Sequence, residues 1–243
     1  VIATKTHAAT ADDARSHVLR ALRELGRERL DIVHIHAPRL ADPFADRAEV
    51  LEELLRMRDD GRIAHVGVSS HYVAAFHRAA AHPEIQVVHP LINRAGMGIL
   101  DGTAADMAEA IAACSRAGKG VYAMKALAGG NLIAEARQSI RFVLGLPGVD
   151  ALALGMLSRR EIEANLELCD TDTADDAAWE ELEKRRRKFM IMEKFCKGCG
   201  ACVEACTADA LALEGGVARV DQDRCILCGY CAAACPEFLI RVV

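Results

Sequence analysis

The run Cys196-Lys-Gly-Cys199-Gly-Ala-Cys202-Val-Glu-Ala-Cys206 decides the fold of the C-terminal part of this chain. The same spacing returns in Cys225-Ile-Leu-Cys228-Gly-Tyr-Cys231-Ala-Ala-Ala-Cys235-Pro236, so the two runs are an internal repeat and hold eight of the ten cysteines. The long segment before them contains only Cys114 and Cys169, which we expect to be small packed residues. This distribution favours thiolates that hold metal in a reducing cytoplasm over the disulfides of a small secreted domain.

The spacing within each run predicts an iron–sulfur cluster. Three cysteines at this spacing can bind one face of a [4Fe–4S] cubane, and the fourth cysteine of such a run ligates the other cluster. We therefore expect two [4Fe–4S] clusters with the following ligands: Cys196, Cys199, Cys202 and Cys235 for the first, and Cys225, Cys228, Cys231 and Cys206 for the second. Zinc is the alternative metal, but structural zinc sites usually take two separated pairs of ligands, which is not this pattern.

The residues around the cysteines agree with this prediction. Gly198, Gly200 and Gly229 allow the backbone to approach inorganic sulfur and to donate N–H bonds to it. Residues 210–220 predict a small hairpin that turns at Glu214-Gly-Gly216. The whole segment resembles the bacterial-type two-cluster ferredoxins and departs from them at Thr207, where proline is frequent.

Upstream, short apolar stretches alternate with amphipathic helical patterns. Short apolar strands are typical of a parallel sheet that is covered on both faces. The predicted strands are Val1–Thr4, Ile32–His36, Ala64–Val68, Gln86–His89, Val121–Lys125 and Ala151–Leu154. The predicted helices are Ala14–Leu25, Ala48–Met57, Ala105–Ala117, Glu135–Leu144 and Arg160–Leu168. Glycines at positions 26, 61 and 118 mark helix ends.

Six β/α units imply a parallel sheet with right-handed crossovers. An open doubly wound sheet and a closed barrel of eight strands both have this alternation. No Gly-x-Gly-x-x-Gly follows the first strand, which disfavours a dinucleotide-binding doubly wound domain. A barrel needs roughly 250 residues, and the chain begins at Val1 inside an apolar strand. We therefore expect a (β/α)8 TIM barrel that lacks its first two β/α units.

Polar residues stand at the ends of several predicted strands. Lys5, His36, Ser69, Asn93 and Lys125 each end or follow a strand. In a β/α barrel the chemistry collects at the carboxyl ends of the strands, so four or more such positions together indicate a site.

These positions carry a resemblance to the aldo-keto reductases over about residues 1–168. The matching stretches are Ile2-Ala-Thr-Lys5, Leu30-Asp-Ile-Val-His-Ile-His36, Gly61-Arg-Ile-Ala-His-Val-Gly-Val-Ser69, Met124-Lys-Ala-Leu-Ala-Gly-Gly130 and Glu161-x3-Asn165-Leu166. The resemblance implies a (β/α)8 barrel that transfers a hydride between NAD(P)H and a small carbonyl or alcohol substrate. The family uses a tetrad of Asp, Tyr, Lys and His.

Two members of that tetrad have counterparts in this sequence. Lys5 matches the lysine, whose charge would lower the pKa of the acid tyrosine, and His36 matches the histidine that orients and polarises the carbonyl. His34 is expected to be a core residue. The resemblance places Asp and Tyr on the two β/α units that this chain lacks, so we expect the chain itself not to reduce carbonyls. No tyrosine occupies a matching position among Tyr72, Tyr122 and Tyr230.

The resemblance also implies cofactor-binding residues: Ser69, Ser70, His89, Leu127, Gly129, Gly130, Glu161 and Asn165. Ser69 matches the serine that binds the nicotinamide amide. Ser70 stands in place of the usual Asn and His89 where Gln is common, so this pocket is altered.

The remaining cofactor positions concern the nucleotide. The stretch 127–130 resembles the pyrophosphate loop, and Asn165 resembles the adenine-binding Asn. Glu161 stands where NADPH-preferring members often have Arg, and its carboxylate would repel a 2′-phosphate. Arg159 and Arg160 nearby leave the choice between NADH and NADPH open.

Three domains follow from these patterns: residues 1–168 form the partial barrel, 169–190 a linker helix and 191–243 the ferredoxin-type domain. The linker pattern spans 171–189, with acidic residues first and a basic run at 184–188, which suits a helix dipole. A net charge of −5 gives no reason to expect nucleic acid. No apolar run approaches the ~18 residues of a membrane span.

Three functions remain open. In the first, the complete protein is an NAD(P)-dependent oxidoreductase with an attached ferredoxin module. In the second, it is an electron-transfer protein whose barrel is a docking scaffold. In the third, the clusters have a structural role. Nicotinamide moves two electrons as hydride, whereas each cluster moves one, so the clusters could serve a redox partner protein.

Overall fold

The computed structural model describes residues 1–171 and 176–242, which form two compact units. Unit 1 comprises Val1–Ile92, Ile99–Met124 and Leu144–Ala153. Unit 2 comprises Asn93–Gly98, Lys125–Val143 and Leu154–Val243. In the described part of the chain, every helix is too short or too polar to span a bilayer.

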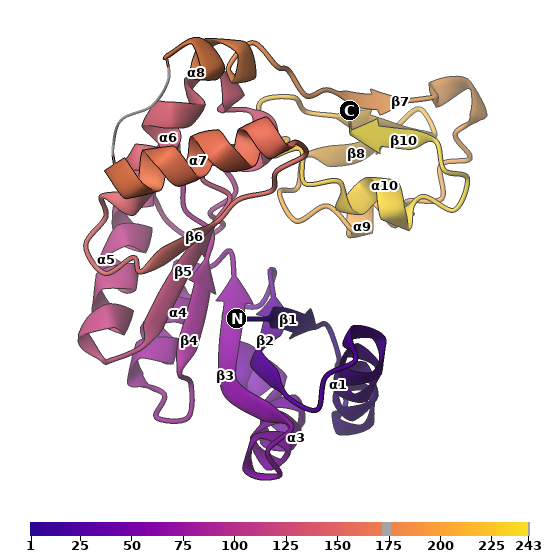
Figure 1. The fold of residues 1–243 in the computed structure, drawn as a ribbon. Coiled ribbons are helices and arrows are strands. Elements are labelled where there is room, and N and C mark those ends of the chain that lie inside the picture. Colours follow the sequence, from indigo (N-terminus) through magenta and orange to yellow (C-terminus); the bar gives the residue numbers. More distant parts are fainter. Residues whose placement is uncertain (172–175, 243) are drawn as a thin grey trace. The chain divides into compact units, whose positions relative to one another are not determined.

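Unit 1 is built on a six-stranded parallel sheet whose strands follow chain order (Figure 1). The strands are β1 (Ala3–Thr6), β2 (Leu30–Ala37), β3 (Ile63–Ser70), β4 (Val87–Pro90), β5 (Gly120–Met124) and β6 (Ala151–Ala153). Within the described residues β1 and β6 are the two edges of the sheet. The structure therefore confirms the six predicted parallel strands of a half-barrel.

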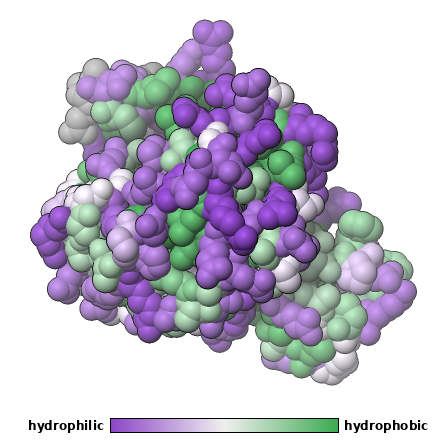
Figure 2. All heavy atoms as spheres, turned by 90° about the horizontal axis from the view of Figure 1, so that it is seen from below, coloured by the Kyte–Doolittle hydropathy of each residue, from purple (hydrophilic) through white to green (hydrophobic). Residues whose placement is uncertain are grey.

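Amphipathic helices cover this sheet. They are α1 (Ala11–Leu25), α2 (Pro43–Asp46), α3 (Ala48–Asp59), α4 (Val73–Ala81) and α5 (Ala104–Arg116). The apolar faces of these helices are buried, with Val18, Leu54 and Phe76 at most 1% exposed. On the face shown in Figure 2, hydrophilic side chains predominate and hydrophobic ones form small islands.

Helix ends follow the predicted local chemistry. Gly26, Gly61 and Gly118 all have positive φ, which L-residues adopt at a cost. Thr103 caps α5 in a capping box with Asp106. Helix α4 was not predicted, although its buried residues Val73, Phe76 and Ala79 recur at helical spacing.

Unit 2 contains η1 (Ala128–Gly130), η2 (Ile133–Glu135), most of α6 (Ala136–Leu144) and α7 (Arg159–Thr171). Its later elements are α8 (Asp176–Leu182), β7 (Phe189–Ile191), η3 (Glu193–Phe195), α9 (Ala201–Glu204), β8 (Leu211–Glu214), β9 (Val217–Val220), α10 (Tyr230–Ala234) and β10 (Ile240–Val242). Strand β7 pairs antiparallel with β10, and β8 with β9 (Figure 1). The predicted hairpin is confirmed, with Gly215 and Gly216 both at positive φ in its turn.

The prediction of one linker helix over residues 171–189 is wrong for the second half of that range. Residues 172–175 lie outside the described residues, α8 ends at Leu182, and Phe189 already begins β7. The basic run at 184–188 is not helical. Its like charges repel one another on a helix, and its arginines bind separate partners: Arg185 pairs with Glu161, and Arg187 donates to the Gly129 carbonyl.

Candidate functional site

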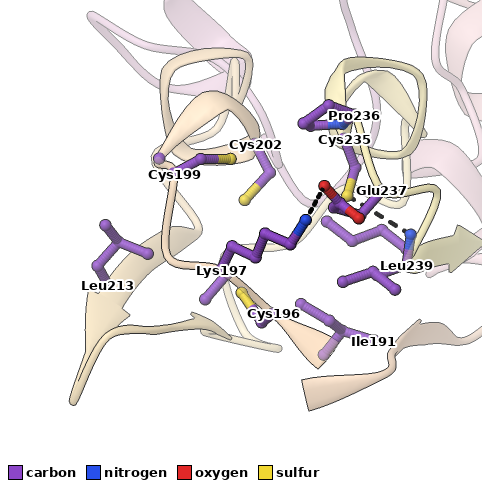
Figure 3. A pocket seen from close by; sticks show the side chains of 13 residues that line it. Ile191, Cys196, Lys197, Cys199, Cys202, Leu213, Cys235, Pro236, Glu237 and Leu239 are labelled. Carbon is purple, nitrogen blue, oxygen red and sulfur yellow. Dashed lines mark hydrogen bonds and ion pairs between the residues drawn. The ribbon is translucent and has the colours of Figure 1, made fainter. Parts of the chain in front are cut away.

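The first cysteine set, Cys196, Cys199, Cys202 and Cys235, lines one cavity of unit 2 (Figure 3). Apolar side chains complete the wall, among them Ile191, Leu213 and Leu239. Cys199 is exposed, whereas Cys202 and Cys235 are buried. At the rim, Lys197 Nζ lies 2.7 Å from a Glu237 carboxylate oxygen, and both side chains are largely in solvent.

The second set, Cys206, Cys225, Cys228 and Cys231, lines another cavity of unit 2, and none of its cysteines is exposed. The hydroxyl of Thr207 lies 4.0 Å from Cys228 Sγ. Each cavity therefore takes three cysteines from one run and the fourth from the other run. This grouping agrees with the crossed ligand sets that the spacing predicts.

The two runs share backbone geometry around their cysteines. Gly200 and Gly229 have φ of +80° and +83° and begin α9 and α10. The amide four residues after each fourth cysteine donates to its sulfur: Ala210 N lies 3.2 Å from Cys206 Sγ, and Leu239 N lies 3.5 Å from Cys235 Sγ. Such N–H···S bonds stabilise negative charge on a ligating sulfur.

Burial makes three of these thiols hard to ionise without a cation. Burial, reinforced by Cys228 and Cys206, raises the pKa of Cys231 to about 12. It also raises the pKa of Cys202 and of Cys225. A thiolate is the form that ligates metal, so iron must supply the charge that stabilises it. Four soft sulfur donors around one cavity fit a [4Fe–4S] cluster.

A segment from the barrel sequence packs on the second run. Within unit 2, the Asn131 side-chain amide donates to the Cys225 carbonyl oxygen at 2.7 Å. A Cβ at Gly129, where φ is +70°, would overlap the Ile226 carbonyl oxygen. Arg187 donates to the Gly129 carbonyl oxygen at 2.9 Å. Residues 125–131, which we call the covering loop, are thus held against residues 225–227.

Lys125 begins the covering loop in a left-handed conformation, with φ of +66°. Its Nζ lies 6.0 Å from the centroid of the Tyr230 ring. Burial lowers the pKa of Lys125, whereas the nearby Cys228 raises it. The five described non-glycine residues with positive φ all lie in unit 2: Lys125, Ala128, Asp209, Leu227 and Phe238. Strained backbone of this kind persists where surrounding contacts determine it.

In unit 1 the strand register places three candidate residues in one row. His36 pairs with Ser69, and Ser69 pairs with His89, on adjacent strands. His36 Nδ1 is hydrogen-bonded to Ser69 Oγ at 2.6 Å. His89 donates from Nδ1 to the Tyr122 carbonyl oxygen at 2.6 Å, and the two rings stack with centroids 4.0 Å apart. Ser70 donates to the Ala37 carbonyl oxygen.

The charge state of His36 follows from its surroundings. Burial, then the charges of Lys5 and His7, lower the pKa of His36 to about 3. The ring is therefore neutral near pH 7, the form in which an imidazole N–H can polarise a carbonyl without carrying charge. Lys5 is exposed at β1, and the His7 ring meets the His36 ring edge-on at 4.4 Å.

His34 is fully buried, as expected for a core residue. Its Nε2 lies 2.6 Å from the Tyr122 hydroxyl. Burial lowers the pKa of His34 well below its usual value and raises that of Tyr122 to about 12, so both groups stay neutral. Tyr122 is therefore tied to His34 within the sheet.

The nucleotide candidates of unit 2 are engaged with protein groups. Glu161 pairs with Arg185 and accepts the Leu157 amide at 2.7 Å. Asn165 donates to the Glu161 carbonyl oxygen at 2.7 Å. Leu127 lies in the covering loop with Gly129, and a Cβ at Gly130 would lie 2.7 Å from the Arg187 side chain. Asn93, another strand-end residue, binds the amides of Ala95 and Met97 and thereby closes its own turn.

Sequence reasoning missed the residues that surround the second set: Lys125, Asn131, Arg187, Thr207 and Tyr230. Lys125 and Thr207 were noted, but as a strand end and as a departure from a familiar pattern. The pair of glycines in the covering loop, Gly129 and Gly130, could have indicated a close backbone contact. The sequence analysis assigned them to a pyrophosphate loop instead.

Comparison with known proteins divides the chain in the same way. A sequence model described as the aldo/keto reductase family matches residues 1–140, which is more than half of the chain. A model described as a 4Fe-4S dicluster domain matches residues 188–236.

Solved structures support the barrel fold. An aldo-keto reductase-like protein of Pseudomonas aeruginosa matches with 25% identity and a TM-score of 0.54, over 65% of this chain and 61% of its own. The holo form of aldo-keto reductase AKR11C1 from Bacillus halodurans matches with 18% identity and a TM-score of 0.56, over 76% of this chain and 71% of its own. The chain thus spans about three fifths of the Pseudomonas protein.

The cysteine segment has separate relatives. An uncharacterized ferredoxin of Methanocaldococcus jannaschii is 46% identical over 56 residues, which are 22% of this chain and 37% of that protein. One component of a Na⁺-translocating ferredoxin:NAD⁺ oxidoreductase complex from Acetobacterium woodii is 46% identical over 49 residues, which are 20% of this chain and 15% of that component.

Proposed function

Because the chain belongs to the aldo/keto reductase family and carries a 4Fe-4S dicluster domain, we propose that it is part of an iron–sulfur oxidoreductase that holds two [4Fe–4S] clusters. The observation that carries this proposal is the sorting of eight cysteines around two cavities, four to each. Each cluster would supply one-electron transfer when bound. The cysteines hold the iron, and the amides of Ala210 and Leu239 stabilise charge on two of their sulfurs.

We assign the crossed ligand sets to this function. The first cluster would be held by Cys196, Cys199 and Cys202 with Cys235, and the second by Cys225, Cys228 and Cys231 with Cys206. The shared cavities support this assignment. Since thiolates of this kind survive in a reducing compartment, the cytoplasm is the proposed location.

A second candidate function is NAD(P)-dependent hydride transfer to a small carbonyl, or from an alcohol, in the whole protein. Neutral His36 beside the Lys5 charge favours it, because a neutral imidazole can donate to a carbonyl oxygen while a cation stabilises developing negative charge. At the nucleotide positions of unit 2, Glu161, Asn165 and Gly129 contact protein groups, whereas the buried Asn165 Oδ1 has no hydrogen-bond partner among the described residues. We assign no step to a nicotinamide.

A redox partner protein is the proposed source or acceptor of the electrons. The cysteine segment is similar to a component of an ion-translocating ferredoxin:NAD⁺ oxidoreductase complex, which supports electron exchange between proteins. Cys199 is the exposed cysteine of the two sets, so the first cluster would lie nearer to solvent than the second.

The metal content tests the first function. Anaerobically purified or reconstituted protein should contain about eight iron and eight sulfide per chain, four of each per cluster. Reduced protein should show the electron paramagnetic resonance of [4Fe–4S]⁺. Stoichiometric zinc without sulfide would refute the proposal.

Nicotinamide binding separates the two functions. NADH and NADPH are added to the cluster-loaded chain, binding is followed by equilibrium dialysis, and cluster reduction is followed by loss of cluster absorbance. We expect neither nucleotide to bind. Saturable binding of either nucleotide would instead favour the hydride-transfer function and show that the contacts of Glu161 yield to the nucleotide.

A further inference from the structure

The covering loop brings a half-buried cation to the second cysteine set, whereas the cation at the first set, Lys197, is exposed. Lys125 lies close enough to Cys228 for the two charges to interact. Its ammonium also lies over the face of Tyr230, which is inside the second run between Cys228 and Cys231. Arg187, whose side chain is exposed, brings another positive charge near Lys125 through its bond to Gly129. At the first set, Lys197 lies near Cys199, but its side chain is exposed and pairs with Glu237.

We propose that the covering loop is part of the site of the second cluster, and that Lys125, assisted by Arg187, raises the reduction potential of this cluster above that of the first. The inference rests on the proposed function, since it requires both clusters. It assigns residues 125–131 to the iron–sulfur module instead of to a nucleotide.

The contacts of the loop favour this assignment. A pyrophosphate loop presents free backbone amides to an anion. Here Gly130 N donates to the Leu127 carbonyl, and Ala128 N donates to the Lys125 carbonyl. The space over Gly129 is filled by Ile226 and Leu227. Asn131 adds a direct bond to a cysteine of the set.

The effect on potential follows from charge. Four thiolates give a [4Fe–4S] cluster a net negative charge, and reduction adds one more electron. A fixed ammonium nearby stabilises the reduced state more than the oxidised state, so the potential rises. The half-buried position of Lys125 weakens solvent screening of this interaction.

The test is a potentiometric titration of the cluster-loaded chain, followed by electron paramagnetic resonance. Lys125→Met should lower one of the two midpoint potentials and leave the other in place. We expect ~tenfold less reduced second cluster at a fixed potential, which corresponds to about 59 mV for a one-electron couple. Lys125→Arg should retain the potential of the unchanged protein. Lys197→Met is the control and should shift neither potential by a comparable amount.

A Cys235→Ala background identifies the affected cluster, because the shift should persist when the first cluster is damaged. Unchanged potentials in Lys125→Met with both clusters present would overturn the inference and leave the proposed function intact. Absence of clusters from the unchanged protein would instead refute the proposed function. If Lys125→Met and Lys125→Arg both lose the second cluster, the midpoint potential of the second cluster is measured in Arg187→Met. An unchanged potential in that variant also overturns the inference.

Discussion

The two cysteine sets have the same spacing but different surroundings. The first set is enclosed by residues of its own segment, has an exposed cysteine and meets a solvent-exposed ion pair. The second set has no exposed cysteine among the described residues and is contacted by a loop about 100 residues earlier in the chain. A repeated motif therefore specifies which ligands gather, whereas the environment of each cluster depends on the rest of the chain.

The largest effect should come from removing a fourth cysteine. Cys235→Ala should damage the cluster of Cys196, Cys199 and Cys202 and lower the iron content below about eight, because it removes one of the four thiolates that hold this cubane. Iron analysis and electron paramagnetic resonance measure this loss.

Cys206→Ala should damage the other cluster by the same reasoning. Cys169→Ala, which changes an exposed thiol outside both sets, is the control and should keep all the iron. Loss of the cluster of Cys225, Cys228 and Cys231 in the Cys235→Ala protein would show that the crossed grouping is wrong.

Gly129→Ala should damage the second set alone. The added Cβ overlaps the Ile226 carbonyl, so the covering loop must leave the cysteine run. Thermal unfolding followed at the cluster absorbance should then show an early transition that accounts for half of the signal.

Gly118→Ala is the matched control for this change. It also places alanine at positive φ, +77°, but nothing lies within 4 Å of its Cβ. It should cost only the ~1–2 kcal/mol of the left-handed conformation. Equal behaviour of the two variants would mean that the loop contact contributes nothing to the second cluster.

A smaller effect is expected from Asn131→Ala. The change removes one hydrogen bond, to the Cys225 carbonyl, which contributes about 0.5–1.5 kcal/mol. Release of iron from the second cluster to a chelator should become a few-fold faster, and release from the first should not change. Gln222→Ala, an exposed change just before the same run, should leave both rates unaltered. Faster release from the first cluster would contradict the assignment of this contact.

The smallest effect is expected from Glu237→Gln at the first set. Lys197 and Glu237 are both largely exposed, and such pairs contribute about 0–1 kcal/mol. Urea unfolding of the cluster-loaded protein should show little change in the free energy of unfolding. A loss well above this range would mean that the first set also depends on a charged neighbour.

Local patterns predicted much of this molecule. The six strands, the glycine helix ends and the cysteine grouping all rest on signals within a few residues or on a repeated spacing. Helix α4 was missed although its apolar residues recur at helical spacing, because a segment of nine residues is short for a prediction from periodicity. The helix predicted around α8 was too long, because charge order alone does not show where a helix ends. The contacts of Lys125, Asn131 and Arg187 could not be predicted, since each joins residues far apart in sequence.

The bond between Asn131 and Cys225 spans 94 residues of chain. Contacts of such separation carry a large loop-closure entropy and form late in folding, whereas adjacent β/α units of the half-barrel can assemble as they leave the ribosome. The covering loop therefore cannot form these contacts until the second run has been synthesised. Because the loop contacts the second run, we expect its closure and insertion of the second cluster to be coupled, and a shortage of iron to leave both incomplete.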